Sequence, residues 1–165
     1  MHSSVSATAA STCPRGVGDS RSEGTHVCAA RGQIDDGQPL HLLNGDDILH
    51  NVNAKSTINK EFDGVMSASK NQMMVPGKVF AKPEVMIPFA CNVHRWMLSY
   101  LGVGGHPFFA VSSAEDSYEI ASLSAGTCEL TVWHAMLAGD TQKVKVHDGV
   151  YTIDLVLNNK LRTNK

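Results

Sequence analysis

Residues 84–103 read EVMIPFACNVHRWMLSYLGV, and this stretch decides the fold that we expect. Apolar side chains alternate at Val85, Ile87 and Phe89, which predicts a β-strand. Residues 98–103 return to a strand-like pattern rich in apolar side chains. The segment between them is short, and we expect it to be a compact loop that joins the two strands.

The rest of the chain also reads as short strands separated by turns. Further strands are predicted at residues 38–44, 48–52, 108–111, 117–120, 127–134, 143–146 and 150–157. Residues 53–77 are polar and predict a long loop, and Pro83 and Pro88 restrict the strand around them to an edge or a bend. A helical pattern is weak and confined to residues 133–137. We therefore expect an all-β protein, built as one sandwich or as two small packed sandwiches.

The composition is typical of a globular protein and does not favour a nucleic-acid-binding or membrane-spanning one. Hydrophobic residues form 42% of the 165, which is ordinary for a globular protein. The net charge of -2 does not favour a nucleic-acid or an anionic-membrane partner, and we expect neither. We also expect no membrane-spanning segment, since no apolar run approaches the ~20 residues that such a helix needs. Residues 1–30, without the apolar segment of a secretory signal, predict a disordered or atypical N-terminal arm, and residues 159–165 a polar tail.

The loop at residues 91–97 carries a C-x2-H-x2-M run formed by Cys91, His94 and Met97. With four Cys, eight His and seven Met in the chain, chance predicts only about 0.008 such runs. The loop therefore presents a thiolate, an imidazole and a thioether together. A second imidazole would complete the ligand set of a copper electron-transfer site, which has two His and one Cys in a plane and a weak axial Met.

His50 is the candidate for that second imidazole. It lies on a predicted strand far from the loop in the sequence, and a sandwich can place such a strand beside the loop. We therefore predict one mononuclear copper ion bound by His50, Cys91, His94 and Met97. Of the three other cysteines, two near the N-terminus are candidates for a disulfide, namely Cys13 and Cys28.

These segments resemble a known family. Residues 47–52 (DILHNV) resemble the His-Asn-Val segment of plastocyanin and amicyanin, and residues 91–97 resemble the ligand loop of amicyanin, including its short two-residue spacings. The resemblance implies a cupredoxin-like Greek-key β-sandwich over residues 31–104 with a type 1-like copper site. It also implies one-electron transfer with a redox partner protein, a periplasmic or secreted location, and no enzymatic activity.

The second half of the chain resembles a different module. Residues 117–120 (SYEI), followed by Leu123, Gly126 and Leu130, are similar to the strand-turn-strand repeat of a carboxypeptidase-regulatory-like (transthyretin-like) β-sandwich, as in bacterial secreted proteins. The resemblance implies that residues 105–158 form a small β module packed on the cupredoxin-like domain.

The chain departs from these patterns in three places. Arg95 stands where such loops usually have proline, which places a positive charge beside the metal. Cys128 stands where the second module usually has an aromatic residue, and residues 1–30 do not resemble the opening strands of a cupredoxin. For His106 and His134 we expect local structural roles, in hydrogen bonding and in packing.

Two other functions fit parts of the sequence. An extracytoplasmic interaction or structural module with a vestigial copper loop would account for the second half of the chain and for Arg95. A hydrolytic zinc site of His50, Cys91 and His94 with an open fourth position is the other. Thioether is a poor zinc ligand, and the sequence places no Asp or Glu obviously as a general base for hydrolysis.

Overall fold

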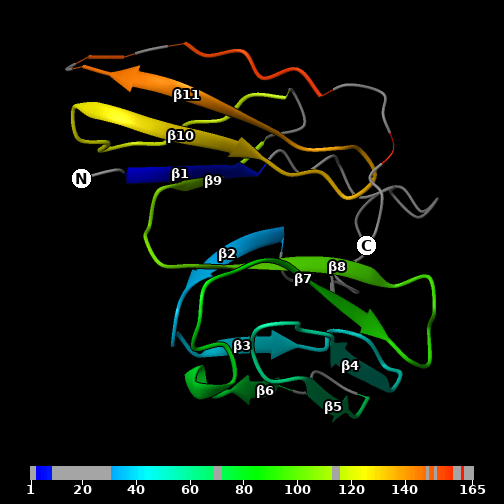
Figure 1. Cartoon of the computed structure of the whole chain (residues 1–165). Coiled ribbons are helices and arrows are strands. Elements are labelled where there is room, and N and C mark those ends of the chain that lie inside the picture. The colour runs from blue at the N-terminus through cyan, green and yellow to red at the C-terminus, as the bar shows by residue number, and fades with distance from the viewer. Residues whose placement is uncertain are drawn as a thin grey trace. The chain divides into compact units, whose positions relative to one another are not determined.

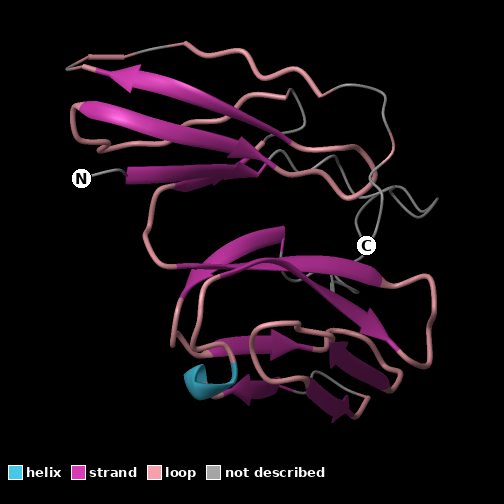
Figure 2. Cartoon of the chain, in the orientation of Figure 1, coloured by secondary structure: helices cyan, strands magenta, loops and turns pink. Residues whose placement is uncertain are grey.

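The protein is all-β, as the sequence predicts (Figure 1, Figure 2). The computed structural model describes the backbone of residues 3–8, 31–68, 72–112, 116–147, 149–150, 152–157 and 161. These residues form eleven β-strands and one short 3-10 turn, η1 at Gly77–Val79, and include no α-helix. Nothing in this described part is a helix long and apolar enough to cross a membrane.

The chain folds as two compact units. One consists of Gly18–Pro107, and the other of Met1–Val17 together with Phe108–Lys165. We refer to them as the 18–107 unit and the 108–165 unit. The units divide after Pro107, whereas the sequence predicted a division after residue 104.

The 18–107 unit is built on a five-stranded sheet. Its strand order is β2-β8-β7-β4-β5, with bounds Arg31–Asp35 for β2, His50–Ala54 for β4, Phe62–Met66 for β5, Glu84–Cys91 for β7 and Leu98–Gly104 for β8. β2 runs parallel to β8, and the other neighbouring pairs are antiparallel. The two strands predicted from residues 84–103 are therefore adjacent and antiparallel, with the loop between them at one end of the sheet.

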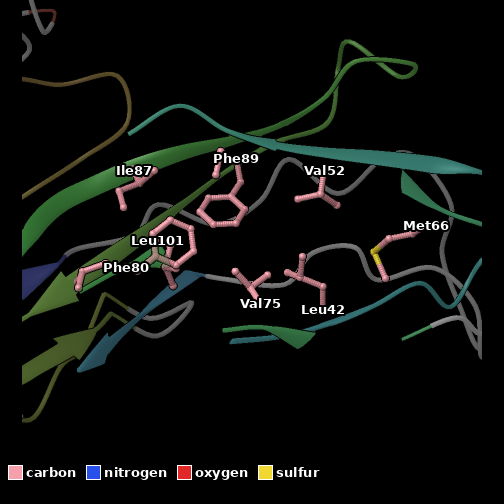
Figure 3. Packing of buried hydrophobic residues seen from close by; sticks show 10 residues of the cluster. Leu42, Val52, Met66, Val75, Phe80, Ile87, Phe89 and Leu101 are labelled. Atoms are coloured by element: carbon pink, nitrogen blue, oxygen red, sulfur yellow. The ribbon is translucent and has the colours of Figure 1, made fainter. Parts of the chain in front are cut away.

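A second sheet, of two strands, completes this unit. It pairs β3 (Leu40–Leu43) with β6 (Gln72–Val75) in antiparallel register. Buried side chains from both sheets and from the segment after η1 meet in one core (Figure 3): Leu42, Val52, Ala54, Met66, Val75, Phe80, Ile87, Phe89, Leu101 and Val103. Because both sheets contribute one face to the same core, the unit has the architecture of a small β-sandwich.

The prediction of a long loop over residues 53–77 is wrong, because this range contains β5, β6 and the first residue of η1. Along β5 the side chains of Phe62 and Met66 share one face with the position of Gly64, since these residues are two apart. Gly64 interrupts the apolar pattern on that face. A Cβ at Gly64 would lie 2.7 Å from the sulfur of Met73 and 2.8 Å from Cζ of Phe62, so these side chains occupy the space that an apolar side chain at this position would fill.

Of the two outcomes that the prolines predicted, an edge or a bend, the edge is not found, because β7 lies between β8 and β4 in the sheet. Pro83 precedes the strand, and Pro88 lies where the pairing with β4 ends. The Pro88 carbonyl still accepts a hydrogen bond from the Lys55 N–H at 3.1 Å. The missing N–H of proline is therefore tolerated at the last position of this ladder.

A β-bulge in β7 supplies the bend that the sequence suggested. The register with β8 shifts between Glu84 and Ile87, and Met86 within the shift has a φ of 53°. The extra residue changes the side of the sheet to which the neighbouring side chains point. Val85 is consequently 65% exposed, although the alternating pattern placed it on the same side as the buried Ile87.

The 108–165 unit contains a four-stranded sheet of order β11-β10-β1-β9, with bounds Ser3–Thr8 for β1, Phe109–Val111 for β9, Gly126–Val132 for β10 and Asp140–Val146 for β11. β1 runs parallel to both β9 and β10, and β10 is antiparallel to β11. Cys128 and Leu130 form the centre of its core. Partly buried side chains pack against them: Phe108, Tyr118, Ile120, Leu123, Val144, Val146, Ile153 and Leu155.

The strands predicted at residues 117–120 and 150–157 are not present, because the described residues of both segments are irregular. The Tyr118 hydroxyl donates to the Ile153 carbonyl at 2.8 Å, and both side chains pack on the core of the unit. The alternation in these segments therefore reflects apolar side chains that pack on the sheet, although the segments themselves are not paired as strands.

The N-terminal arm predicted at residues 1–30 is described only in part. Ser3–Thr8 form β1, which pairs with β9 and β10 of the 108–165 unit. Cys13 and Cys28, the candidates for a disulfide, lie outside the described residues.

Candidate metal centre

Two neighbouring strands bring His50 and Cys91 to one face. His50 is the first residue of β4, Cys91 is the last residue of β7, and Val52 pairs with Cys91 across the ladder. Directly paired residues direct their side chains to the same face of a sheet, and so do residues two apart on one strand. His50 and Cys91 therefore point into the same region. Both are buried, with 1% and 6% of their surface exposed.

The loop after Cys91 returns His94 to the same sulfur. The Cys91 N–H donates to the Met97 carbonyl at 3.2 Å, and the Met97 N–H donates to the His94 carbonyl at 2.9 Å. The His94 N–H donates to Cys91 Sγ at 3.3 Å. Arg95, which replaces the usual proline of the loops that this one resembles, is exposed, and the loop closes with it in place.

Three donor atoms converge at this point. Cys91 Sγ lies 3.5 Å from His94 Nδ1 and 3.9 Å from His50 Nδ1. One donor atom from each residue lies within 4.8 Å of the other two. Zinc, as a guide to first-row metals, binds sulfur at about 2.3 Å and imidazole nitrogen at about 2.0 Å, so one ion shared at about 110–120° would separate them by about 3.5–3.7 Å. The three donors could therefore hold a single metal ion.

Hydrogen bonds at Cys91 favour the thiolate. Burial raises the pKa of the thiol, but the backbone N–H groups of Asn51 and His94 and the ring of His50 outweigh burial and lower the pKa of Cys91 to about 6. Burial also lowers the pKa of His50, and hydrogen bonds to Cys91 and Asp46 outweigh it, so that the pKa of His50 is raised. A thiolate at neutral pH is the form of cysteine that binds a metal.

Asp46 is a residue of this site that the sequence reasoning missed. It is buried, with 8% of its surface exposed, and its Oδ2 lies 2.8 Å from His50 Nε2. In the sequence it lies between the strands predicted at residues 38–44 and 48–52, where a turn is expected, and turn residues are usually solvated. The signal that could have revealed it is an acidic residue four positions before a candidate histidine ligand.

Met97, the predicted axial ligand, is half-buried at the end of the loop. Its backbone makes both hydrogen bonds that close the loop, whereas ligation by its thioether stays a prediction.

Three aromatic rings follow one another from the buried site towards the surface. The ring centroids of His50 and His94 are 4.8 Å apart, those of His94 and Trp96 are 5.4 Å apart, and Trp96 is 81% exposed.

The other histidines with predicted local roles stand apart from the metal-ligating group, which in the described part of the chain consists of His50, Cys91 and His94. His134 Nδ1 accepts the N–H groups of Met136 at 3.1 Å and Leu137 at 2.9 Å. The chain bends at these residues, where the sequence predicted a weak helix.

Comparison with known proteins gives no relative: the chain matches no family model, no curated protein and no solved structure. The resemblance to blue copper proteins therefore stays a prediction.

Proposed function

We propose that this protein binds one copper ion and transfers single electrons outside the cytoplasm. His50, Cys91 and His94 would hold the ion, with Met97 as a weak axial ligand. One observation carries the proposal: two imidazole nitrogens from separate segments lie 3.5 and 3.9 Å from one buried sulfur. Two imidazoles with one thiolate are typical of copper electron-transfer sites, in which copper supplies the one-electron Cu(II)/Cu(I) couple.

The surroundings of the ligands support electron transfer over hydrolysis. A hydrolytic zinc site needs a carboxylate or an imidazole free to act as a general base. The buried carboxylate nearest to the ligands in the described residues is Asp46, and its Oδ2 is engaged by His50 Nε2 at 2.8 Å. Its place behind the ring of a ligand favours a role in orienting that ring.

The fold supports electron transfer with little movement of the ligands. His50 and Cys91 are held by paired strands, and the loop that carries His94 is closed by two backbone hydrogen bonds. Rigid strands hold ligands nearly fixed, so little reorganisation accompanies each electron. The ring of His94, next to the exposed Trp96, provides a route from the buried site to the surface.

A second candidate function is an interaction module in which the copper loop is vestigial. Three apolar side chains are exposed on the loop and just after it: Val93 (54%), Trp96 (81%) and Leu98 (55%). Exposed apolar side chains that cluster are typical of protein-binding surfaces. The same surface would serve a redox partner in the copper-binding protein, so the metal decides between the two functions.

Titration of the reduced, metal-free protein with Cu(II), followed by visible absorption, tests the proposal. We expect an intense thiolate-to-copper band that saturates at one copper per chain. Cys91→Ser should abolish the band. The matched control is Cys128→Ser, which replaces the buried thiol of the other unit and should keep it.

The absorption band and the binding of copper decide between the candidate functions. A band that persists in Cys91→Ser would refute the proposed ligand set. A wild-type protein that stays colourless and loses copper on gentle dialysis would support the interaction module instead. Hydrolysis of a test ester that depends on added zinc would favour the hydrolytic site.

A further inference from the structure

A buried carboxylate faces the outer side of a ligand ring. Asp46 Oδ2 lies 2.8 Å from His50 Nε2, and both side chains are almost inaccessible to water. The opposite nitrogen of the same ring, His50 Nδ1, faces Cys91 Sγ. The imidazole is thus held between a carboxylate and the thiolate of the metal centre.

The turn that carries Asp46 is held by a network of hydrogen bonds. The buried Asn44 accepts the Asp46 N–H through Oδ1 at 3.0 Å. Its Nδ2 donates to the carbonyls of Ile48 and Ser67, both at 2.9 Å. These bonds tie the turn before β4 to the end of β5. The backbone of Asp46 is therefore held in place in the metal-free protein, and its Oδ2 already lies against the ring of His50.

We infer that Asp46 is a positioning residue for the metal centre: it fixes His50 with the proton on Nε2 and Nδ1 free for the metal, and it strengthens Nδ1 as a donor. This inference deepens the proposed function and rests on it. A carboxylate that accepts the second N–H of a ligating histidine fixes the tautomer and the ring orientation and raises the basicity of the ligand.

The charge of Asp46 also acts on the choice between the two states of copper. The thiolate of Cys91 and the carboxylate of Asp46 together bring two negative charges into a buried region. This pair balances Cu(II), whereas Cu(I) leaves one negative charge in excess. Because charges interact strongly where water is excluded, Asp46 favours Cu(II) over Cu(I).

The first test uses the copper-loaded protein with Asp46→Asn, which keeps the size of the side chain and an oxygen acceptor but removes the charge. We expect about a tenfold loss of Cu(II) affinity relative to Cu(I), which corresponds to a rise of ~59 mV in reduction potential. The matched control is Asp47→Asn, since Asp47 is the exposed neighbour. Equal potentials in the two variants would overturn the effect of the charge.

The second test needs no copper. Nitrogen NMR of the His50 ring in the metal-free protein should show a proton on Nε2 that is shared in a hydrogen bond with Asp46. Asp46→Ala should lower the fraction of rings that carry a proton on Nε2, and Asp46→Asn, which keeps an acceptor, should restore it. An unchanged fraction in Asp46→Ala would overturn the inference. A wild-type protein that gives no copper band refutes the proposed function, and the NMR result then decides the role of Asp46 independently.

Discussion

Glu84 offers a sharp test of how the 18–107 unit is held together. It is buried, with 7% of its surface exposed, at the start of β7. Its carboxylate accepts a hydrogen bond from the side chain of Ser56. It also accepts hydrogen bonds from Thr57, through the N–H at 2.7 Å and the hydroxyl at 3.0 Å. Two more come from Asn59, through the N–H at 3.2 Å and the side-chain amide at 3.0 Å. This carboxylate therefore fastens the loop between β4 and β5 to the sheet.

The magnitude follows from the pKa of this carboxyl group. Burial raises the pKa, but the hydrogen bonds from Ser56, Thr57 and Asn59 outweigh it and lower the pKa from 4.5 to about 2. At 1.36 kcal/mol per pKa unit, this difference corresponds to about 3 kcal/mol of folding free energy. Because the pKa in the folded protein is the lower one, the stabilisation is complete above pH ~4.5 and is lost as the pH falls towards ~2.

Glu84→Gln removes the charge and places an NH2 group among donors. We expect it to lower the free energy of unfolding at pH 7 by about 3 kcal/mol, since buried donors lose a charged acceptor. With an m-value of about 1.5 kcal/mol/M, the midpoint of urea unfolding would fall by ~2 M. Unfolding followed by circular dichroism at several pH values between 7 and 2.5 measures both effects. Glu61→Gln, at an exposed position in the same region, is the matched control.

The pH dependence distinguishes this mechanism from a general loss of packing. The difference in stability between the wild type and Glu84→Gln should shrink as the pH falls from 4.5 to 2.5, because protonated Glu84 is also neutral. A difference that stays constant over that range would refute the reasoning, and so would a loss at pH 7 no larger than that of Glu61→Gln.

Three other substitutions test the core, the surface and the axial ligand. Phe80→Ala in the fully buried core should cost about 3–5 kcal/mol in urea unfolding, and a loss below ~1 kcal/mol would contradict the packing described. Trp96→Ala should change stability by less than ~0.5 kcal/mol but slow electron self-exchange of the copper form; an unchanged rate would exclude the ring as a route. Met97→Leu should keep the visible band and raise the reduction potential measured by voltammetry, and an unchanged potential would exclude axial ligation.

The part of the site that the sequence could determine is the part that is local. Cys91 and His94 are three residues apart, and the covalent chain alone keeps them close enough for the His94 N–H to bond Cys91 Sγ at 3.3 Å. The same holds for the closure of the loop at Met97. The strands on either side were also predictable, because alternation of side chains is a property of each strand by itself.

The all-β class was predictable for the same reason, whereas several strands were not. Gly64 interrupts the apolar pattern of β5 where the side chain of Met73 packs against it, and the bulge in β7 turns Val85 outward. The alternation at residues 117–120 belongs to side chains that cover a sheet without joining it. In each case a contact with a distant segment decided the local structure, and a single segment carries no trace of its distant contacts.

The sequence by itself determined a C-x2-H-x2-M loop between two strands, with His50 as a candidate partner. Only the tertiary structure decided that β4 lies next to β7, which brings His50 Nδ1 to 3.9 Å from Cys91 Sγ, and that Asp46 lies behind the ring at 2.8 Å. The physical reason is the range of the forces involved. Spacing along a loop is set by covalent geometry, whereas the choice of neighbouring strands is set by the burial of a common core, to which residues from the whole unit contribute.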